Sequence, residues 1–254
     1  MSRIGTLVYS FVCYAVFLAV FVYAIGFIDG FLTPTSLDAA PKIPLGAAVA
    51  IDLALLAGFA VQHSGMARPA FKRWWTRIVP EPAERSTYVL VSSLLMIALF
   101  AFWQPIGGVV WDVGQGAARN VVIGLYLFGW VLLLYSTFLI DHFDLFGLKQ
   151  GWRKLTGKAY RAPQFYTPSL YKLVRHPLYV GWLVIFWAAP VMTAAHLLFA
   201  LMTTAYILVA IQLEERDLVT AFGDQYVEYR RRTPMLIPRF GKRSATAQTR
   251  AART

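Results

Sequence analysis

The chain has 254 residues, of which 58% are hydrophobic and only 15% are charged. A soluble domain usually carries about a quarter charged residues, so the composition excludes an ordinary soluble protein and predicts an all-α integral membrane protein. The net charge of +11 could indicate nucleic-acid binding, but no recognition motif accompanies it, and membrane topology and anionic lipid head groups explain it better.

Five apolar stretches have about the length that a helix needs to cross a bilayer. They cover Ile4–Ile28, Pro44–Val61, Tyr88–Val110, Val121–Ile140 and Leu178–Leu213. The last stretch would reach roughly 54 Å as one helix, far more than a hydrocarbon core of about 30 Å. Pro190 and His196 lie near its middle, so we expect two helices folded back as a hairpin. This predicts six crossings, or five if one limb is short or partly re-entrant.

The basic residues alternate between the connections. Segments 62–87 and 141–177 hold five and seven Lys or Arg, and the chain from residue 214 holds nine, whereas 29–43 and 111–120 hold one each. Basic loops stay in the cytoplasm, so we predict that the N-terminus, both basic loops and the C-terminus are cytoplasmic. Residues 71–77 mix aromatic and basic side chains, which is typical of a segment lying in the membrane interface. Residues 244–254 are small, polar and basic, which predicts a disordered tail.

Ionisable groups near a membrane core are costly, so each is a candidate functional residue. Four polar clusters fall at the predicted cytoplasmic ends of the apolar stretches: Gln62–Ser64, Asp141–Asp144, Arg175–Pro177 and Glu214–Asp217. Their convergence predicts a functional site at this face. His63, His142 and His176 could share one cavity there, which leaves a haem or metal site open. Each histidine could equally form a hydrogen bond at a helix end. A single cysteine, Cys13, excludes a disulfide framework within the chain and a cysteine-only metal site.

The C-terminal third carries a specific pattern. It consists of an RHPLYVG segment at 175–181, Glu214-Glu215, an FGDQYVEY segment at 222–229, and then Pro234 and Pro238. This pattern covers about 65 residues and resembles the signature of the isoprenylcysteine carboxyl methyltransferase and phospholipid methyltransferase superfamily. In that superfamily the segment forms the S-adenosylmethionine pocket without a Rossmann fold.

The remaining motifs narrow the resemblance. Segments 62–68 (QHSGMAR) and 141–148 (DHFDLFGL) resemble those of the bacterial methanethiol S-methyltransferases, which are related to NnrU-like proteins. Gly65 departs from the larger apolar residue expected there. The resemblance implies one membrane domain over residues 1–243, with its cofactor-binding part at about 140–240, in the bacterial inner membrane. It also implies S-adenosylmethionine as cofactor, a small volatile thiol as substrate, most simply methanethiol converted to dimethyl sulfide, and no metal.

The resemblance also implies the site residues. The cofactor-binding set is Arg175, His176, Tyr179, Gly181, Glu214, Glu215, Tyr226 and Tyr229. The two glutamates suit the ribose hydroxyls and the ammonium group, Arg175 and His176 suit the carboxylate, and the tyrosines suit adenine or the methylsulfonium. Gly181 would let the backbone approach the cofactor closely. Neutral pH leaves little thiolate, so we expect a histidine base, either His63 or His142, with Asp141 or Asp144 orienting the ring.

Three alternatives remain open on the sequence alone. A methyltransferase of the same fold could act on an isoprenylcysteine carboxylate or a lipid amine. A haem-binding NnrU-like membrane protein would draw axial ligands from the histidines, although the intact EE and FGxxYxxY patterns favour S-adenosylmethionine. A transporter or assembly factor would have no need for the cofactor residues. The oligomeric state cannot be inferred from the sequence.

Overall fold

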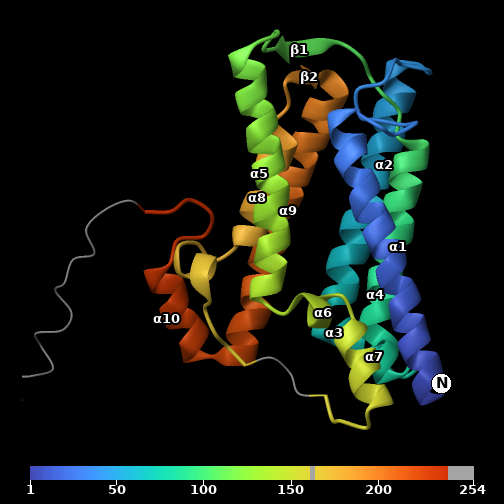
Figure 1. The fold of residues 1–254 in the computed structure, drawn as a ribbon, viewed down its shortest axis with the longest axis vertical. Coiled ribbons are helices and arrows are strands. Elements are labelled where there is room, and N and C mark those ends of the chain that lie inside the picture. The colour runs from blue at the N-terminus through green and yellow to red at the C-terminus, as the bar shows by residue number, and fades with distance from the viewer. Residues whose placement is uncertain (161–163, 240–254) are drawn as a thin grey trace, which may run out of the picture.

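The computed structural model describes residues 1–160 and 164–239. Five helices in this part of the chain are long and apolar enough to cross a membrane. They are α1 (Arg3–Asp29), α2 (Leu45–Ala67), α4 (Glu81–Phe102), α5 (Ala117–Leu139) and α9 (Ala194–Phe222). Figure 1 shows them side by side along the long axis of the molecule. Many of their large apolar side chains point outward, such as Val22, Val131 and Val209, because lipid takes the place of water around them.

The last apolar stretch is a hairpin, as predicted, and its first limb is short. Helix α8 (Pro177–Trp187) has 11 residues, which span about 16 Å at 1.5 Å per residue. The chain then turns through Pro190 and returns as α9. A 3₁₀ turn, η1 (Ser169–Lys172), precedes α8. The structure therefore has five long helices and one half-length limb, which is one of the two expected outcomes.

A two-stranded ribbon closes one end of the bundle. Strand β1 (Val109–Asp112) pairs antiparallel with β2 (Val191–Thr193), with Val109 opposite Thr193 and Asp112 opposite Val191. The sequence prediction that the third apolar stretch continues as helix to Val110 is wrong. Helix α4 ends at Phe102, where the backbone N–H of Gln104 donates to the buried Asp52 carboxylate at 2.8 Å. Pro105 follows at once, and the residue before a proline disfavours helix.

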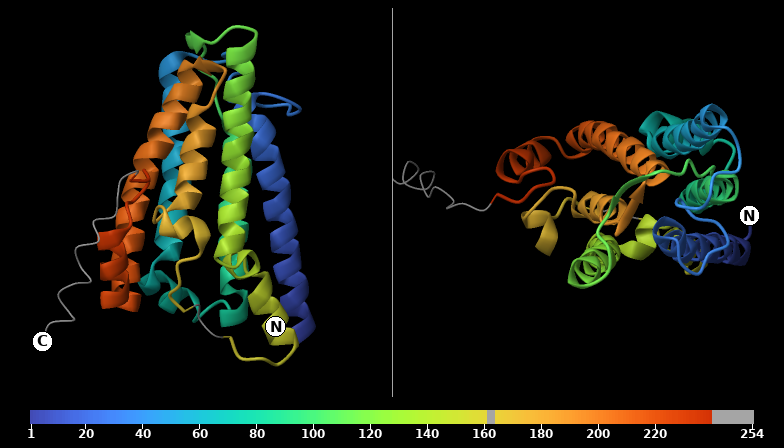
Figure 2. Two further views of the ribbon diagram at one scale, coloured as in Figure 1. Left: turned by 60° about the vertical axis from the view of Figure 1, so that its left-hand side comes forward. Right: turned by 90° about the horizontal axis from the view of Figure 1, so that it is seen from above.

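Short helices gather at the other end of the bundle, where α1 begins (Figures 1 and 2). They are α3 (Pro69–Trp75), α6 (His142–Leu145), α7 (Leu148–Leu155) and α10 (Asp224–Arg232). The start of α1, both basic connections and α10 thus lie at the same end of the bundle. This agrees with the prediction that the basic segments share one side of the membrane. The predicted domain boundary at residue 243 and the tail 244–254 lie outside the described residues.

Two glycines bring α5 and α8 into close contact. A Cβ atom on Gly181 would lie 2.8 Å from the backbone nitrogen of Leu133 and 3.0 Å from the carbonyl oxygen of Gly129. A Cβ atom on Gly129 would in turn lie 2.8 Å from Ile185 Cγ1. Small residues at such crossings let helix backbones pack closely in a membrane, where no hydrophobic force drives helices together. This contact fixes α8, and with it Tyr179, against α5.

Candidate active site

The start of α8 is fastened to the segment that follows α10. The backbone N–H groups of Arg175 and His176 donate to the carbonyl oxygens of Pro234 and Met235 at 2.9 and 3.2 Å. The Arg175 guanidinium also donates to the carbonyl oxygen of Thr233 at 2.7 Å. Prolines 234 and 238 of the sequence motif therefore belong to a segment that closes this end of the bundle.

Glu215 is the centre of a buried charge cluster. Its side chain is 6% exposed, and its Oε1 atom accepts from Arg175 Nε at 2.7 Å and from His176 Nε2 at 3.0 Å. Arg230 lies 3.9 Å from its second oxygen. A buried charge needs such partners, because an unpaired one is strongly destabilising. Arg175 and His176 are thus engaged by Glu215, which differs from the expectation that they bind a cofactor carboxylate.

Glu214 points in a different direction from Glu215, since consecutive helix residues are rotated by about 100°. It is half-buried, and its Oε2 atom accepts from the Tyr179 hydroxyl at 3.0 Å. This phenol is the one hydrogen-bonding partner of the Glu214 side chain among the described residues. Glu214 is therefore the carboxylate of the motif that remains available to a ligand.

Tyr226 and Tyr229 form an aromatic cluster with Phe165. The Phe165 ring lies edge-on to both, at centroid distances of 5.9 and 5.5 Å. The Tyr229 hydroxyl donates to the Tyr171 carbonyl oxygen at 2.6 Å, and burial raises the pKa of Tyr229 to about 12. The Tyr226 hydroxyl is buried and has no hydrogen-bond partner among the described residues. Burial also raises the pKa of Tyr226, so this phenol remains a neutral donor in need of an acceptor.

A pocket opens beside this aromatic cluster, where α9 meets α10. Its volume is about 530 Å³, which falls within the usual size range of small-molecule sites. The lining residues are Gln164, Phe165, Ala221, Phe222 and Gln225. It combines aromatic faces with two amide side chains, the groups suited to a planar heterocycle with hydrogen-bonding edges.

Gly181 does not face this site. The space that its missing Cβ leaves is filled by the backbone of α5, as described above. The expectation that Gly181 lets the cofactor approach the helix is therefore wrong. The close approach that the glycine permits is between two helices.

His63 lies in the last turns of α2 with both ring nitrogens engaged. Its Nδ1 atom is 3.3 Å from the Ser92 hydroxyl, and its Nε2 atom is 3.0 Å from the Tyr88 hydroxyl. The ring also stacks on Phe59, with an interplanar angle of 19°. Ser92 and Tyr88 both come from α4, so the position of the imidazole depends on the packing of α4 against α2.

Two contacts join this histidine cluster to α9. The Ser64 and Tyr206 hydroxyls are 3.2 Å apart, and Arg68 Nη1 lies 2.7 Å from Asp217 Oδ2. Glu214 comes from the same helix as Tyr206 and lies within electrostatic reach of both Tyr206 and Tyr88. The clusters around His63 and Glu214 therefore face one another between α2 and α9.

His142 belongs to a separate aromatic cluster. Its Nε2 and Nδ1 atoms lie 2.8 and 2.7 Å from the hydroxyls of Tyr14 and Thr137, and its ring stacks on Phe138. It is only 3% exposed, and this burial lowers the pKa of His142. Neither neighbouring aspartate touches the ring: Asp141 pairs with Lys149, and Asp144 accepts from Tyr160 and Gln150. The expectation that Asp141 or Asp144 orients the imidazole is therefore wrong.

Each histidine has its own set of hydrogen-bond partners among the described residues. His63 binds Ser92 and Tyr88, His142 binds Tyr14 and Thr137, and His176 binds Glu215. His196 lies at the opposite end, where its ring contacts Asp38 and the Phe186 carbonyl oxygen. Axial ligation of a haem by a pair of these side chains would have to break several of these hydrogen bonds.

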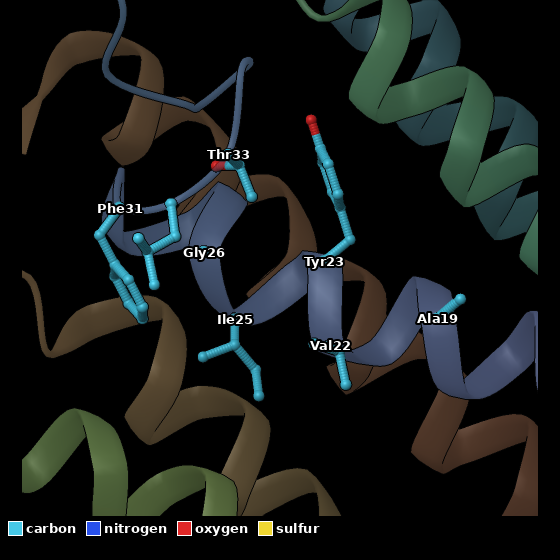
Figure 3. A pocket seen from close by; sticks show the side chains of 8 residues that line it. Ala19, Val22, Tyr23, Ile25, Gly26, Phe31 and Thr33 are labelled. Atoms are coloured by element: carbon cyan, nitrogen blue, oxygen red, sulfur yellow. The ribbon is translucent and has the colours of Figure 1, made fainter.

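A second pocket lies far from these polar groups, on the final turns of α1 (Figure 3). It has a volume of about 310 Å³ and is lined by Ala19, Val22, Tyr23, Ile25, Gly26, Phe31, Leu32 and Thr33. The Tyr23 hydroxyl is engaged by Thr35 at 2.7 Å. No carboxylate, histidine or cation lines this pocket, so it offers no group for acid–base chemistry.

Comparison with known proteins identifies the family. The chain is 52% identical to the methanethiol S-methyltransferase of Crocosphaera subtropica, over 96% of each protein. It is 50% identical to methanethiol S-methyltransferase 2 of Bradyrhizobium diazoefficiens, over 99% of the chain and 97% of that protein. The chain belongs to the methanethiol S-methyltransferase family. The family expected from the sequence motifs is thereby confirmed.

The wider relationships of this family agree with a multi-pass membrane protein. Nurim of Xenopus laevis is 29% identical to the chain, over 82% of the chain and 75% of nurim. No protein-family model matches the sequence, and no solved structure matches it either. The five helices that are long and apolar enough to cross a membrane support the same class.

The sequence motifs do not include two tyrosines of the site. Tyr88 begins the third apolar stretch, and Tyr206 lies inside the last one. Helical spacing gives only a weak signal for Tyr206, because Tyr206 precedes Glu214 by eight positions and residues eight apart are rotated by about 80° around a helix. Tyr88 gives no comparable signal, since its contact with His63 depends on how α4 packs on α2.

Proposed function

We propose that this chain transfers a methyl group from S-adenosylmethionine to methanethiol and forms dimethyl sulfide. The observation that carries the proposal is the meeting of two clusters across the α2–α9 junction. One presents an available carboxylate with a phenol, Glu214 with Tyr179, and the other presents an imidazole with a phenol, His63 with Tyr88. The family relationship supports the same reaction, since the two relatives described above are methanethiol S-methyltransferases.

The residues present fit the proposed methyl donor. S-adenosylmethionine carries two cationic groups, and cations in a poorly solvated site must be paired or solvated by dipoles. Glu214 offers a carboxylate with one engaged oxygen, and the buried Tyr226 hydroxyl lacks an acceptor among the described residues. We therefore assign Glu214 to a cationic or hydroxyl group of the donor and Tyr226 to one of its acceptors.

The remaining motif residues position or surround Glu214 and Tyr226. Tyr179 and Tyr206 place aromatic faces near Glu214, and such faces attract a methylsulfonium through the ring quadrupole. Arg175, His176 and Glu215 hold the start of α8 to α9, which positions Tyr179 rather than binding the donor directly. Tyr229 closes the aromatic cluster through its bond to Tyr171.

The chain's own residues have two tasks in this reaction. When bound, the donor supplies an electrophilic methyl group, which the sulfur of the thiolate takes as the bond to the sulfonium breaks. The protein must therefore remove the thiol proton and keep water away from the reacting sulfur atoms. His63 is the base that we propose, because it lies in the cluster that faces Glu214, whereas His142 is enclosed by its own aromatic cluster. Excluding water favours the step, since cation and thiolate give neutral products.

We further propose that the site faces the cytoplasm of a bacterium, with the protein in the inner membrane. The basic connections and α10 lie at the end of the bundle that carries the site (Figure 1). The distribution of Lys and Arg over short loops governs orientation. This orientation also gives the site access to S-adenosylmethionine, a polar metabolite that does not cross the bilayer unaided.

Headspace measurement of dimethyl sulfide tests the proposal. Detergent-purified protein is incubated with S-adenosylmethionine and methanethiol, and donor binding is measured separately by calorimetry. Glu214→Gln removes the available carboxylate. Glu228→Gln is its matched control, because the partners of Glu228 among the described residues are Arg231 and Arg232 on the exposed face of α10. We expect sulfide from the parent and the control, and a loss of donor affinity in Glu214→Gln.

Other outcomes would overturn the proposal in distinguishable ways. Donor binding without sulfide would retain the methyltransferase and discard the thiol, and an isoprenylcysteine and a lipid amine would then be tested as acceptors. Neither binding nor sulfide would discard both. An unchanged affinity in Glu214→Gln would remove Glu214 from the donor site.

A further inference from the structure

We infer that Tyr88 carries the thiol proton to His63, and that Ser92 and Gln62 hold the imidazole in the tautomer that receives it. This inference rests on the proposed function and deepens it. The phenol contacts the substrate, the imidazole is the final proton acceptor, and the serine and the amide are positioning residues.

The directions of the hydrogen bonds follow from the chemistry of the groups. The Ser92 hydroxyl donates its single proton to Gln62 Oε1 at 3.2 Å, because an amide oxygen can only accept. The same hydroxyl must therefore accept from His63 Nδ1, which lies 3.3 Å away. In a neutral imidazole one nitrogen is a donor and the other an acceptor. His63 then carries its proton on Nδ1 and presents a lone pair on Nε2.

This lone pair is covered by the Tyr88 hydroxyl, which lies 3.0 Å from Nε2 and 3.2 Å from the backbone carbonyl oxygen of His63, so that these two acceptors share the single phenolic proton. Both ring nitrogens of His63 are thus occupied, and no lone pair of the imidazole is open to a thiol. The phenolic oxygen has lone pairs of its own and can accept while it donates. A thiol can therefore reach the base only through the Tyr88 oxygen.

The relay conserves every proton. As the S–H bond breaks, its proton passes to the Tyr88 oxygen, and the phenolic proton passes to His63 Nε2. Tyr88 is again a neutral phenol, His63 is an imidazolium, and the substrate is a thiolate ready to accept the methyl group. The positive charge that the donor brings thus ends on His63, and both sulfur atoms end as neutral sulfides.

Several charged or titratable groups surround the relay, and they define its electrostatics. Arg85 on α4 lies over the Tyr88 ring at 5.2 Å and is anchored to the Leu145 carbonyl oxygen. The other groups are Arg68 on α2, Tyr179 on α8, and Tyr206, Glu214 and Asp217 on α9. Arg85 favours negative charge on the phenolic oxygen during the transfer, and the same cation opposes positive charge on His63 after it.

The dependence of the methylation rate on pH tests the relay. Tyr88→Phe removes the oxygen that links thiol and imidazole, so only thiolate formed in solution can react. Free cysteine, with a pKa of about 8.5, is roughly 3% ionised at pH 7, and a simple alkyl thiol is less acidic and therefore less ionised. We therefore expect a loss of about 30-fold or more at pH 7, with the rate rising tenfold per pH unit and approaching the parent above the thiol pKa.

The controls separate the relay from a structural role. Tyr9→Phe removes a phenol that bonds Thr87, the neighbour of Tyr88 on α4, at 2.9 Å, and should keep the profile of the parent. His63→Ala removes the proton acceptor and should reproduce the profile of Tyr88→Phe, so the test does not depend on one variant folding. Replacing methanethiol by the more acidic 2,2,2-trifluoroethanethiol should reduce the factor by which both variants are slower than the parent at pH 7.

Variant pH–rate profiles that run parallel to the profile of the parent would overturn the inference. If Tyr88→Phe and His63→Ala lower the rate by the same factor at every pH, the two residues act only through packing. A parent protein that forms no sulfide at any pH would instead count against the proposed function.

Discussion

Tyr206 on α9 lies 3.2 Å from Ser64 on α2, hydroxyl to hydroxyl. One residue before Ser64, His63 stacks on Phe59, and the Phe59 ring lies edge-on to Tyr206. Through this contact the N-terminal helices, which hold the proposed base, meet the C-terminal helices, which hold the methyltransferase motif. The site is therefore shared by parts of the chain about 150 residues apart in sequence.

The charge cluster around Glu215 should be essential for stability. Glu215→Ala leaves Arg175 buried without its carboxylate, and breaking a buried ion pair typically costs about 3–5 kcal/mol. We expect a large drop in the thermal unfolding temperature in detergent. Glu228→Ala is the control, because its partners Arg231 and Arg232 are exposed and such pairs contribute about 1 kcal/mol at most. Equal drops in the two variants would contradict a buried pair.

The Tyr226 hydroxyl should serve the ligand more than the fold. Its donor has no acceptor among the described residues, so Tyr226→Phe should leave the ligand-free protein as stable as the parent or slightly more stable. Donor affinity should fall about five- to tenfold, which corresponds to one hydrogen bond of about 1 kcal/mol. Calorimetry with S-adenosylmethionine measures the affinity. Tyr229→Phe should show the reverse pattern, since its hydroxyl bonds the Tyr171 carbonyl oxygen.

The α5–α8 contact should tolerate no larger side chain at Gly181. The added Cβ of Gly181→Ala would lie within 3.0 Å of three backbone atoms of α5, which cannot move independently of their helix. Overpacking of this kind costs about 1–3 kcal/mol. Gly124→Ala is the control. Gly124 lies on α5, and a Cβ atom added there meets nothing within 4 Å, so this variant should be as stable as the parent or more stable. Unfolding in detergent distinguishes the two, and a neutral Gly181→Ala would contradict the close crossing.

His142 should make stability depend on pH. Burial lowers its pKa below the ordinary value of 6.5, so the unfolded chain binds a proton more readily than the folded protein. Stability from this group is fully present above pH 6.5 and is lost as the pH falls below that value, at most about 1.4 kcal/mol per pH unit. His142→Gln should flatten this part of the profile. Melting temperatures between pH 5 and pH 7.5 measure the difference, and identical slopes would show that other groups dominate.

The Asp141 carboxylate provides the comparison for that measurement. Asp141→Asn breaks the pair with Lys149 but keeps a residue that tolerates the positive φ of 73° at this position. Because Asp141 does not touch His142, the variant should retain the slope of the parent below pH 6.5.

Much of this architecture is determined locally and could be predicted from the sequence. Apolar length follows from the cost of placing polar groups in lipid, so the all-α membrane class and the existence of five long apolar helices were predictable. The hairpin was also predictable, since 36 residues from 178 through 213 exceed one crossing and contain a proline. Arg175 and His176 before α8 meet Glu215 of α9, and Tyr179 of α8 meets Glu214, because these residues lie close together in the C-terminal third of the chain.

Only the tertiary structure decided which partner each polar atom takes. Hydrogen bonds act over about 3 Å, whereas helix boundaries and packing angles predicted from sequence are uncertain by far more than that. Glu214 and Glu215 are neighbours in sequence, yet helix geometry turns one toward Tyr179 and the other toward Arg175. Tertiary packing likewise decides that Gly181 contacts α5 and that Asp141 pairs with Lys149. The contact between His63 and Tyr88 likewise depends on the packing of α2 against α4, which no local pattern encodes.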